Sequence, residues 1–241
     1  IWPGKVAIAV VLLSCERRSN LNPYNNWYQV LFDRLNCPFD DFQNNKLTVV
    51  TFNYDRSLEQ YMFERFRNTY TGRAENECKE KLNQLEILHV YGSLGRLSWQ
   101  TDDPENPIPE VPYGGETRLT HDTVIAAAKS LQIMPESTTE ESGRFQKFQE
   151  FMKDCKALYF LGFGCHDVNM QRLGIDTLRK PSKVMGTAQG LSYQRMKEIE
   201  RLDIRQLRIP EGLFRKSIYD FLHQCVNFNE GGYPPAWVYQ E

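Results

Sequence analysis

The stretch that decides the fold is residues 47–55, which read LTVVTFNYD. Its first six residues are mostly apolar or β-branched, a composition typical of a short buried strand. The polar group NYD ends this strand, and a helix is expected next because Leu58, Met62 and Phe66 recur at helical spacing. A strand that passes into a helix through a polar turn is the local pattern of an α/β fold.

Three further strands are expected along the chain. They cover residues 86–91, 157–161 and 183–185, and each is followed at once by a glycine-bearing turn. Helices are expected between them, and this alternation implies right-handed βαβ units and a parallel sheet. The predicted fold is therefore α/β and Rossmann-like, with helices on both faces of the sheet. In such folds the ligand lies at the carboxyl ends of the strands, where these turns cluster.

The other elements are expected to be mainly helical. Residues 5–17 fit a helix by length and a strand by β-branched content, and we assign a helix. A polar, proline-rich stretch at about residues 100–115 is expected to be a loop. Further helices are predicted at residues 22–37, 122–131, 144–153, 193–202 and 213–225. Residues 1–241 are interpreted as one domain with a loop and helical insertion at about residues 95–150.

Composition excludes several classes of function. The 29 basic and 31 acidic residues give a net charge of −2 without a Lys- or Arg-rich run, so direct nucleic-acid binding is not expected. The longest apolar run, residues 6–13, is far shorter than the roughly 20 residues of a membrane span, so no membrane association is expected. None of the six cysteines forms a Cys-x-x-Cys pair, which argues against a zinc ribbon and favours reduced thiols in the cytoplasm.

The turn after the first strand resembles that of the sirtuins. These proteins carry a Thr-Gln-Asn-x-Asp segment at the end of a strand, and Thr51, Asn53 and Asp55 stand here at the same spacing. The order of the later motifs is similar too, with a histidine-bearing strand before a Gly-Ser turn and then a strand before a glycine turn. The resemblance covers about residues 45–190. It is greatest to bacterial sirtuin-like proteins of antiviral defence, many of which hydrolyse NAD.

The resemblance implies that the chain binds NAD and that Asn53 is catalytic. Cleavage of the nicotinamide–ribose bond generates an oxocarbenium-like ribose, which requires a positioned nucleophile. Asn53 would orient water or a ribose hydroxyl, Asp55 would hold the nicotinamide carboxamide, and Thr51 belongs to the same binding segment. Alternatively, these residues form only a strand-to-helix turn with Asp55 as the helix N-cap.

The glycine turns are the other candidate contacts with NAD. Gly162-Phe163-Gly164 resembles the sirtuin Gly-Thr-Ser turn that approaches the phosphates and the adenosine ribose, because glycine lets backbone N–H groups come close to an anion. The change from Thr-Ser to Phe-Gly removes two hydroxyl donors. Gly186 and Thr187 would add a further backbone contact after the next strand.

The expected catalytic base is displaced. Sirtuins place a histidine directly before the glycine of this turn, whereas here Tyr91 precedes Gly92 and Ser93, and His89 lies two residues upstream. Side chains two apart on a strand share a face, so His89 and Tyr91 are expected about 6–7 Å apart. We assign His89 as the base and Tyr91, Gly92 and Ser93 as ligand contacts. His89 fits a hydrogen-bonded core histidine equally well, and His166 is the second candidate.

The predicted function is hydrolysis of NAD to ADP-ribose and nicotinamide in bacterial antiviral defence. The chain lacks the deacetylase zinc module, which disfavours protein deacylation, and no metal cofactor is expected. It also lacks the sirtuin Gly-Ala-Gly-x-Ser loop and begins with Ile1, so we expect an N-terminally incomplete domain. The alternatives are a non-catalytic sensor of NAD or ADP-ribose, and a protein deacylase or ADP-ribosyltransferase. Expected partners are NAD and either a second copy of the chain or a fused or separate sensor domain.

Overall fold

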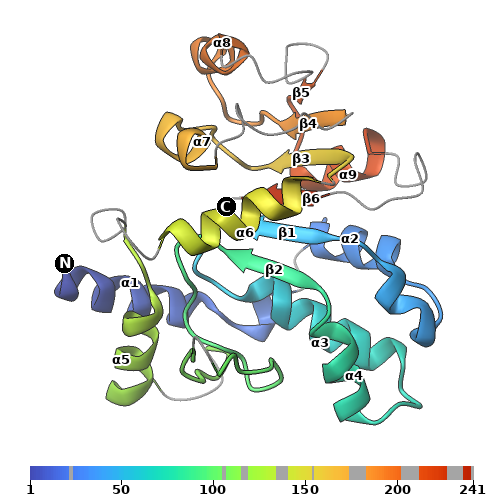
Figure 1. The fold of residues 1–241 in the computed structure, drawn as a ribbon, viewed down its shortest axis with the longest axis vertical. Coiled ribbons are helices and arrows are strands. Elements are labelled where there is room, and N and C mark those ends of the chain that lie inside the picture. Colours follow the sequence, from blue (N-terminus) through green and yellow to red (C-terminus); the bar gives the residue numbers. More distant parts are fainter. Residues whose placement is uncertain are drawn as a thin grey trace. The chain divides into compact units, whose positions relative to one another are not determined.

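The computed structural model describes residues 1–21, 24–104, 107–114, 119–133, 141–153, 155–173, 183–201, 212–226 and 236–239. The chain divides into two compact units (Figure 1). The sheet unit comprises Asn44–Phe52, Glu86–Val90 and Thr139–Glu241, and the helical unit comprises Ile1–Gln43, Asn53–Leu85 and Tyr91–Thr138. Each unit is therefore assembled from separate segments of the chain.

The sheet unit contains a parallel sheet in the order β2-β1-β6-β3-β4-β5. Its strands are β1 (Thr48–Thr51), β2 (Glu86–His89), β3 (Ala157–Leu161), β4 (Lys183–Thr187), β5 (Leu213–Phe214) and β6 (Ala236–Tyr239). Thr51 lies opposite both His89 and Tyr239, and Thr187 lies opposite Phe214. The strands therefore end at one edge of the sheet, and the predicted α/β, Rossmann-like class is confirmed.

The order of the described strands follows the pattern of a doubly wound dinucleotide-binding fold. In the common order 3-2-1-4-5-6 the first strand of the chain lies at the centre. Here the last strand, β6, takes that place and pairs with β1 on one side and β3 on the other. The two halves of the sheet run outward from β6, so the carboxyl ends of β1 and β3 flank the switch point where such folds bind ligands.

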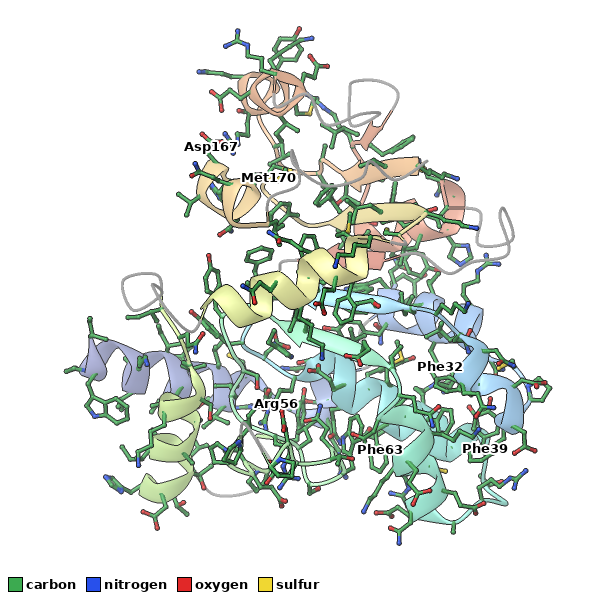
Figure 2. The ribbon with its side chains drawn as sticks, viewed as in Figure 1. Phe32, Phe39, Arg56, Phe63, Asp167 and Met170 are labelled. Carbon is green, nitrogen blue, oxygen red and sulfur yellow. The ribbon has the colours of Figure 1, made fainter. Side chains whose placement is uncertain are left out.

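Helices of the sheet unit cover its strands (Figure 1). They are α6 (Glu141–Lys153), α7 (Asp167–Leu173), α8 (Tyr193–Arg201) and α9 (Ile218–Gln224). Phe221 of α9 packs its ring 6.2 Å from that of Tyr159 and 5.5 Å from that of Phe214. On α7, Met170 is buried whereas Asp167 at the helix start is exposed (Figure 2). The apolar face of each of these helices is thus turned toward the core of the unit.

The helical unit has two apolar clusters. Its elements are α1 (Trp2–Cys15), η1 (Arg18–Asn20), α2 (Trp27–Leu35), η2 (Phe39–Asn44, which ends at the unit boundary), α3 (Ser57–Thr69), α4 (Glu75–Leu82) and α5 (His121–Ser130). Ala9 and Leu13 of α1 pack in one cluster with Val124 and Ala127 of α5. The other cluster is aromatic and includes Phe63, which stacks on Trp99 with ring centroids 4.8 Å apart (Figure 2). The helix predicted at residues 5–17 is confirmed as α1.

Two predicted helices have different boundaries in the structure. The helix predicted from residue 22 begins at Trp27, because the side chain of Asn26 accepts a hydrogen bond from the Tyr28 amide at 2.9 Å and caps it. The predicted helix at residues 213–225 is wrong in its first part, where Leu213–Phe214 forms β5. Its helical part, α9, begins after Ser217, whose hydroxyl accepts from the Asp220 amide at 3.1 Å. Residues 22–23 and 202, at the ends of two predicted helices, lie outside the described residues.

The strands also differ in extent from the prediction. Strands β1 and β2 are shorter than predicted, and β4 continues through Gly186 and Thr187, which were expected to follow it. Gly186 donates its amide to Gly212 at 2.7 Å, which commits this group to the sheet edge. The sequence analysis missed α4 and the central strand β6 altogether. The candidate site residues therefore lie on strands and turns with these corrected bounds.

Candidate functional site at the strand ends

The carboxyl ends of β1 and β2 lie side by side in the sheet unit. Thr51 and His89 are Cα partners in the register, and the Val90 amide donates to the Thr51 carbonyl at 2.9 Å. Thr51 is fully buried, so its side chain belongs to the core, whereas His89 is partly exposed at the end of β2. Of these two predicted site residues, His89 is therefore the one whose side chain reaches the surface of the unit.

The turn at residues 53–56 begins the helical unit and leads into α3. Asn53, Tyr54 and Asp55 are all partly exposed. Asp55 accepts a hydrogen bond from the Ser57 amide at 3.0 Å, so one carboxylate oxygen caps the first turn of α3. The alternative that Asp55 is the helix N-cap is wrong in position, because Arg56 is the N-cap and Asp55 lies one residue before it. The second oxygen of Asp55 is the one that could face a ligand.

The Gly92-Ser93 turn is hydrogen-bonded to the turn at residues 53–56. The Leu94 amide donates to the Tyr54 carbonyl at 2.9 Å, and the Tyr54 hydroxyl donates to the Gln132 carbonyl at 2.8 Å. Gly92 has φ +77°, in the region that favours glycine. Ser93 donates its hydroxyl to the Gly95 carbonyl at 3.2 Å. Two motifs separated by some forty residues of sequence are thus brought together, as the parallel arrangement predicted.

The expectation that His89 and Tyr91 share one strand face is wrong. Strand β2 ends at His89, and the next two residues form a turn. Tyr91 is buried in the helical unit, where its carbonyl accepts from the Gln132 amide at 2.8 Å. The alternation of side chains along a strand does not extend to Tyr91, so the two residues cannot be paired by that rule.

The turn after β3 is joined to β1 by an aromatic contact. Phe163 is only 2% exposed, and its ring lies 5.1 Å from that of Phe52 and 5.4 Å from that of Phe160. The Phe163 side chain is therefore a core anchor, and a ligand at this turn would meet backbone. Gly162 is exposed with φ +62°, and its amide donates to the Thr187 hydroxyl at 2.8 Å. Thr187 thus supports the turn through its side chain.

Gly164, Cys165 and His166 complete this turn. A Cβ on Gly164 would lie 3.2 Å from Nε2 of His166, so the exposed imidazole folds back over the glycine. Cys165 has φ +50°, which is unusual for a residue with a side chain. Burial raises the pKa of the Cys165 thiol to about 12, against a smaller lowering effect of Arg195. The thiol is therefore protonated at neutral pH and is a poor nucleophile or metal ligand.

Sequence reasoning missed Arg195, which holds this turn from α8. Its guanidinium donates to the Cys165 carbonyl at 2.6 Å and to the Gly164 carbonyl at 3.3 Å. It also pairs with Glu198 at 2.9 Å and with Asp167 at 3.5 Å. The hydrogen bond that Arg195 donates to Glu198 is the main reason that the pKa of Arg195 is raised. No local signal in the sequence connects residue 195 with a turn thirty residues earlier.

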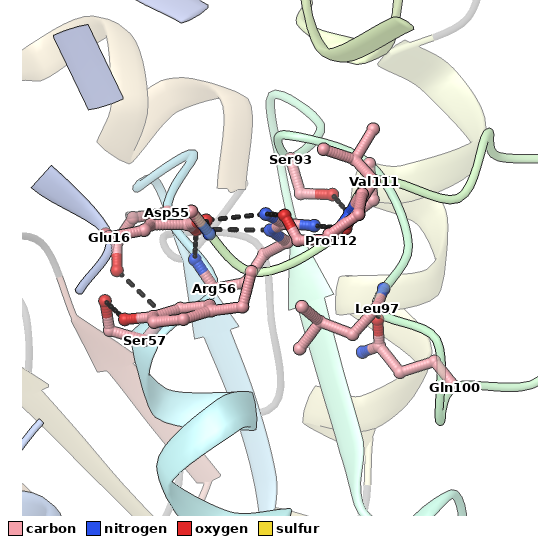
Figure 3. Close-up of polar contacts among 12 residues, drawn as sticks. Glu16, Asp55, Arg56, Ser57, Ser93, Leu97, Gln100, Val111 and Pro112 are labelled. Atoms are coloured by element: carbon pink, nitrogen blue, oxygen red, sulfur yellow. Dashed lines mark hydrogen bonds and ion pairs between the residues drawn. The ribbon is translucent and has the colours of Figure 1, made fainter. Parts of the chain in front are cut away.

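A buried ion pair beside the turn at residues 53–56 was also missed (Figure 3). Glu16 and Arg56 are each 1% exposed and meet at 2.5 Å. The one available signal was that Arg56 directly follows Asp55. A charged residue at a polar turn is ordinarily exposed, so the sequence gave no reason to search for its partner.

The described part of the chain contains no group of three or more His, Cys, Asp or Glu side chains that could hold a metal ion. Within the same residues, every helix is too short or too polar to cross a membrane. The fold and the clustered strand-end turns define a parallel α/β protein of the dinucleotide-binding type.

The comparison with protein families identifies which kind of α/β protein this is. The model of the SIR2-like domain matches residues 47–202, more than half of the chain, and the chain belongs to this family. The match begins at β1 and includes each strand-end turn described above. No curated protein and no solved structure gives a significant match. SIR2-like domains bind NAD, so the chain has an NAD-related function.

Proposed function

We propose that this protein binds NAD and hydrolyses its nicotinamide–ribose bond, releasing nicotinamide and ADP-ribose. The observation that carries the proposal is the hydrogen bond from Leu94 to Tyr54, which joins the turn that follows Asn53 to the Gly92-Ser93 turn. These are the two motifs on which the resemblance to sirtuins rests, and both lie within the matched region. Ligands of such folds bind where strand-end turns meet.

In this proposal Asn53, His89 and Asp55 have separate roles in the reaction. Water attacks the ribose carbon that carries nicotinamide, the C–N bond breaks, and its electron pair neutralises the pyridinium nitrogen. Asn53 orients the water through its uncharged amide, and His89 accepts the proton that the water loses. The free oxygen of Asp55 holds the nicotinamide carboxamide. The exposed backbone around Gly162 and Gly164 lies against the phosphates or the adenosine ribose.

The proposed biological setting is bacterial antiviral defence in the cytoplasm, where NAD depletion halts an infected cell. A second copy of the chain, or a sensor domain fused to it or separate from it, would supply the trigger. The proposed site uses no metal. Stoichiometric zinc in the purified protein, measured by elemental analysis, would contradict this part of the proposal.

Incubation of the purified protein with NAD tests the reaction. Free nicotinamide is expected without any acceptor, and Asn53→Ala should abolish its release because the nucleophile is no longer oriented. His89→Ala should slow release by about 100-fold or more, the typical contribution of a general base. The exposed residues Asn68 and His223 provide matched controls, since Asn68→Ala and His223→Ala should leave the rate unchanged.

The same assay separates the competing functions. Nicotinamide release that requires a protein acceptor would identify a deacylase or transferase. Binding of NAD without any release would identify a sensor, and the buried Tyr91 before Gly92 is the feature that favours that outcome. If release occurs and His89→Ala has no effect, the base assignment is wrong, and His166 is the next residue to substitute.

A further inference from the structure

The Glu16–Arg56 ion pair joins three segments of the helical unit (Figure 3). Glu16 follows the last residue of α1, and Arg56 directly precedes α3. The guanidinium of Arg56 also donates to the Val111 carbonyl at 2.6 Å and to the Pro112 carbonyl at 3.2 Å. The pair therefore fixes the end of α1 and a loop of the chain to the residue that ends the turn at residues 53–56.

The Glu16 carboxylate binds Arg56 through both its main chain and its side chain. One oxygen accepts from the Arg56 amide at 2.8 Å and from Nε at 3.1 Å, while the other accepts from Nη2 at 2.5 Å. The second oxygen also accepts from the Gly114 amide at 3.3 Å. Because the Glu16 carboxylate binds both the main-chain amide and the guanidinium of Arg56, the Arg56 side chain has little rotational freedom. Glu16 thus determines the backbone position of Arg56 as well as neutralising its charge.

Gly114 lies in close contact with the end of α1, beside the Glu16–Arg56 ion pair. A Cβ at Gly114 would overlap the carbonyl oxygen of Leu13, in the last turn of α1. Only glycine therefore allows the loop at residues 111–114 to lie against the helix end and deliver its amide to Glu16. A side chain at residue 114 would therefore displace the loop from the end of α1 and from Glu16.

Arg56 stands where the chain changes from a turn to a helix. Its backbone has φ −116° and ψ 28°, outside both the strand and the helix regions, so external contacts must define it. Asp55 caps the Ser57 amide on its far side, and Tyr54 is held by Leu94 and Gln132. Glu16 supplies a further tether at the end of the turn that begins at Asn53.

We infer that Glu16 is a positioning residue for Asn53, acting through the backbone of Arg56. The inference rests on the proposed function, in which Asn53 orients the attacking water. A displacement of a reacting group by about 1 Å can cost roughly 100-fold in rate. Loss of the Glu16 tether should therefore lower kcat more than it weakens NAD binding, because the contacts proposed around Gly162 and Gly164 lie on another turn.

The first test compares Glu16→Gln with Glu75→Gln. Glutamine has nearly the shape of glutamate, but its amide group opposes the Arg56 guanidinium, donor against donor. Glu75 forms an exposed ion pair with Arg67 at 3.1 Å in the same unit and serves as the matched control. Once circular dichroism shows that both variants are folded, Glu16→Gln should lower kcat by about 10- to 100-fold and change KM far less, and Glu75→Gln should change neither.

A double variant separates positioning from folding if Glu16→Gln does not fold. Replacement of a buried ion pair by apolar residues of similar volume often preserves stability, so Glu16→Met/Arg56→Met should fold. The inference predicts a folded protein with low kcat, and amides of residues 53–57 that exchange with deuterium faster than in the parent protein. A double variant with normal kcat per folded molecule would overturn the inference.

Hydrogen exchange also distinguishes the two proposals. If the parent protein releases no nicotinamide, the proposed function fails. Deuterium exchange of residues 53–57 in the variants then tests only whether Glu16 holds this segment in place. Faster exchange in that segment, with the centre of α3 unchanged, would support Glu16 as its tether. Unchanged exchange in that segment would overturn the positioning role, whatever the activity.

Discussion

At the scale of single residues, the turn after β3 illustrates how burial determines reactivity. Cys165 lies beside an exposed glycine turn and next to His166, an order of residues that suggests a nucleophile and its base. The structure places the thiol in the core, where burial raises its pKa to about 12, and Arg195 offsets this only in part. The adjacent imidazole lies over Gly164. Cys165 is therefore a structural residue of this turn.

This assignment predicts the alkylation pattern of the native protein. At pH 8 iodoacetamide should modify the exposed Cys15 readily and Cys165 far more slowly, because the buried thiol is both protonated and covered. Peptide mass spectrometry of the labelled protein measures both rates, and unfolding in urea should equalise them. Equal labelling of the two cysteines in the native state would show that the turn opens easily.

The raised pKa of Cys165 also predicts how stability depends on pH. The folded state holds the thiol proton more tightly than the unfolded state, whose thiol titrates near pH 8.5. The resulting stabilisation is fully present below that pH and is lost as the pH rises toward 12. Urea midpoints at pH 8 and pH 10.5 should therefore differ more for the parent protein than for Cys165→Ala. If the urea midpoint changes equally with pH in both proteins, the pKa of Cys165 is not raised in the folded state.

Some residues of the candidate site could be predicted from the sequence and others could not. Asn53 and Asp55 were found because a polar group directly after an apolar strand is a local pattern. Glu16 and Arg195 were not, because each acts on a turn thirty or more residues away through contacts that only the fold creates. Phe163 was read as a ligand contact from its place in a glycine turn, but its ring is buried against Phe52. The local pattern at these turns could be found in the sequence, and the long-range contacts that hold the turns could not.

At the scale of elements, α8 acts as the support of the turn after β3. Arg195 reaches from the first half of this helix to two backbone carbonyls, while Met196 and Ile199 bury the helix in the sheet unit. Carbonyl groups in a tight turn need donors, and the guanidinium provides several in a fixed plane. The position of Gly162 and Gly164 thus depends on how α8 is docked.

Two substitutions on α8 should separate its backbone contacts from its ion pairs. Arg195→Gln removes the donors to Gly164 and Cys165 and should lower the free energy of unfolding by about 1–3 kcal/mol. Glu198→Gln removes only a partly exposed ion pair and should cost about 0.5 kcal/mol or less. Urea denaturation measures both. If both substitutions lower the free energy of unfolding equally, the contacts of Arg195 with the two carbonyls contribute little to stability.

Two of the elements that were not predicted, β5 and β6, are short strands. Strand β6 has only four residues and β5 only two, too few for a periodic pattern to be distinguished from a loop or a helix end. Both are strands because neighbouring strands pair with them. By contrast, β3 was predicted with the bounds that the structure shows, since its apolar run stands between the charged residues before it and the glycine turn after it.

At the scale of the whole sheet, the two halves that the structure describes meet through β6. Strands β1 and β2 lie on one side and β3, β4 and β5 on the other, and among the described strands β1 and β3 each reach the other half through β6. The carboxyl ends of β1 and β3 are thus kept in register by the last strand of the chain. The geometry at the switch point depends on a segment that lies outside the family match.

This dependence can be tested with a single residue in β6. Val238 lies opposite Val50 of β1 and Phe160 of β3, in the middle of the sheet. Val238→Pro removes a backbone donor and places a ring within a central strand, where proline is not tolerated, so it should destabilise the protein by about 3 kcal/mol or more. Val238→Ala keeps the backbone donor and is the matched control. Urea denaturation compares the two variants, and deuterium exchange should show lost protection at Thr48–Thr51 and Ala157–Leu161 only in the proline variant. If proline and alanine have equal effects, the centre of the sheet is not held by β6, and another strand must occupy that place.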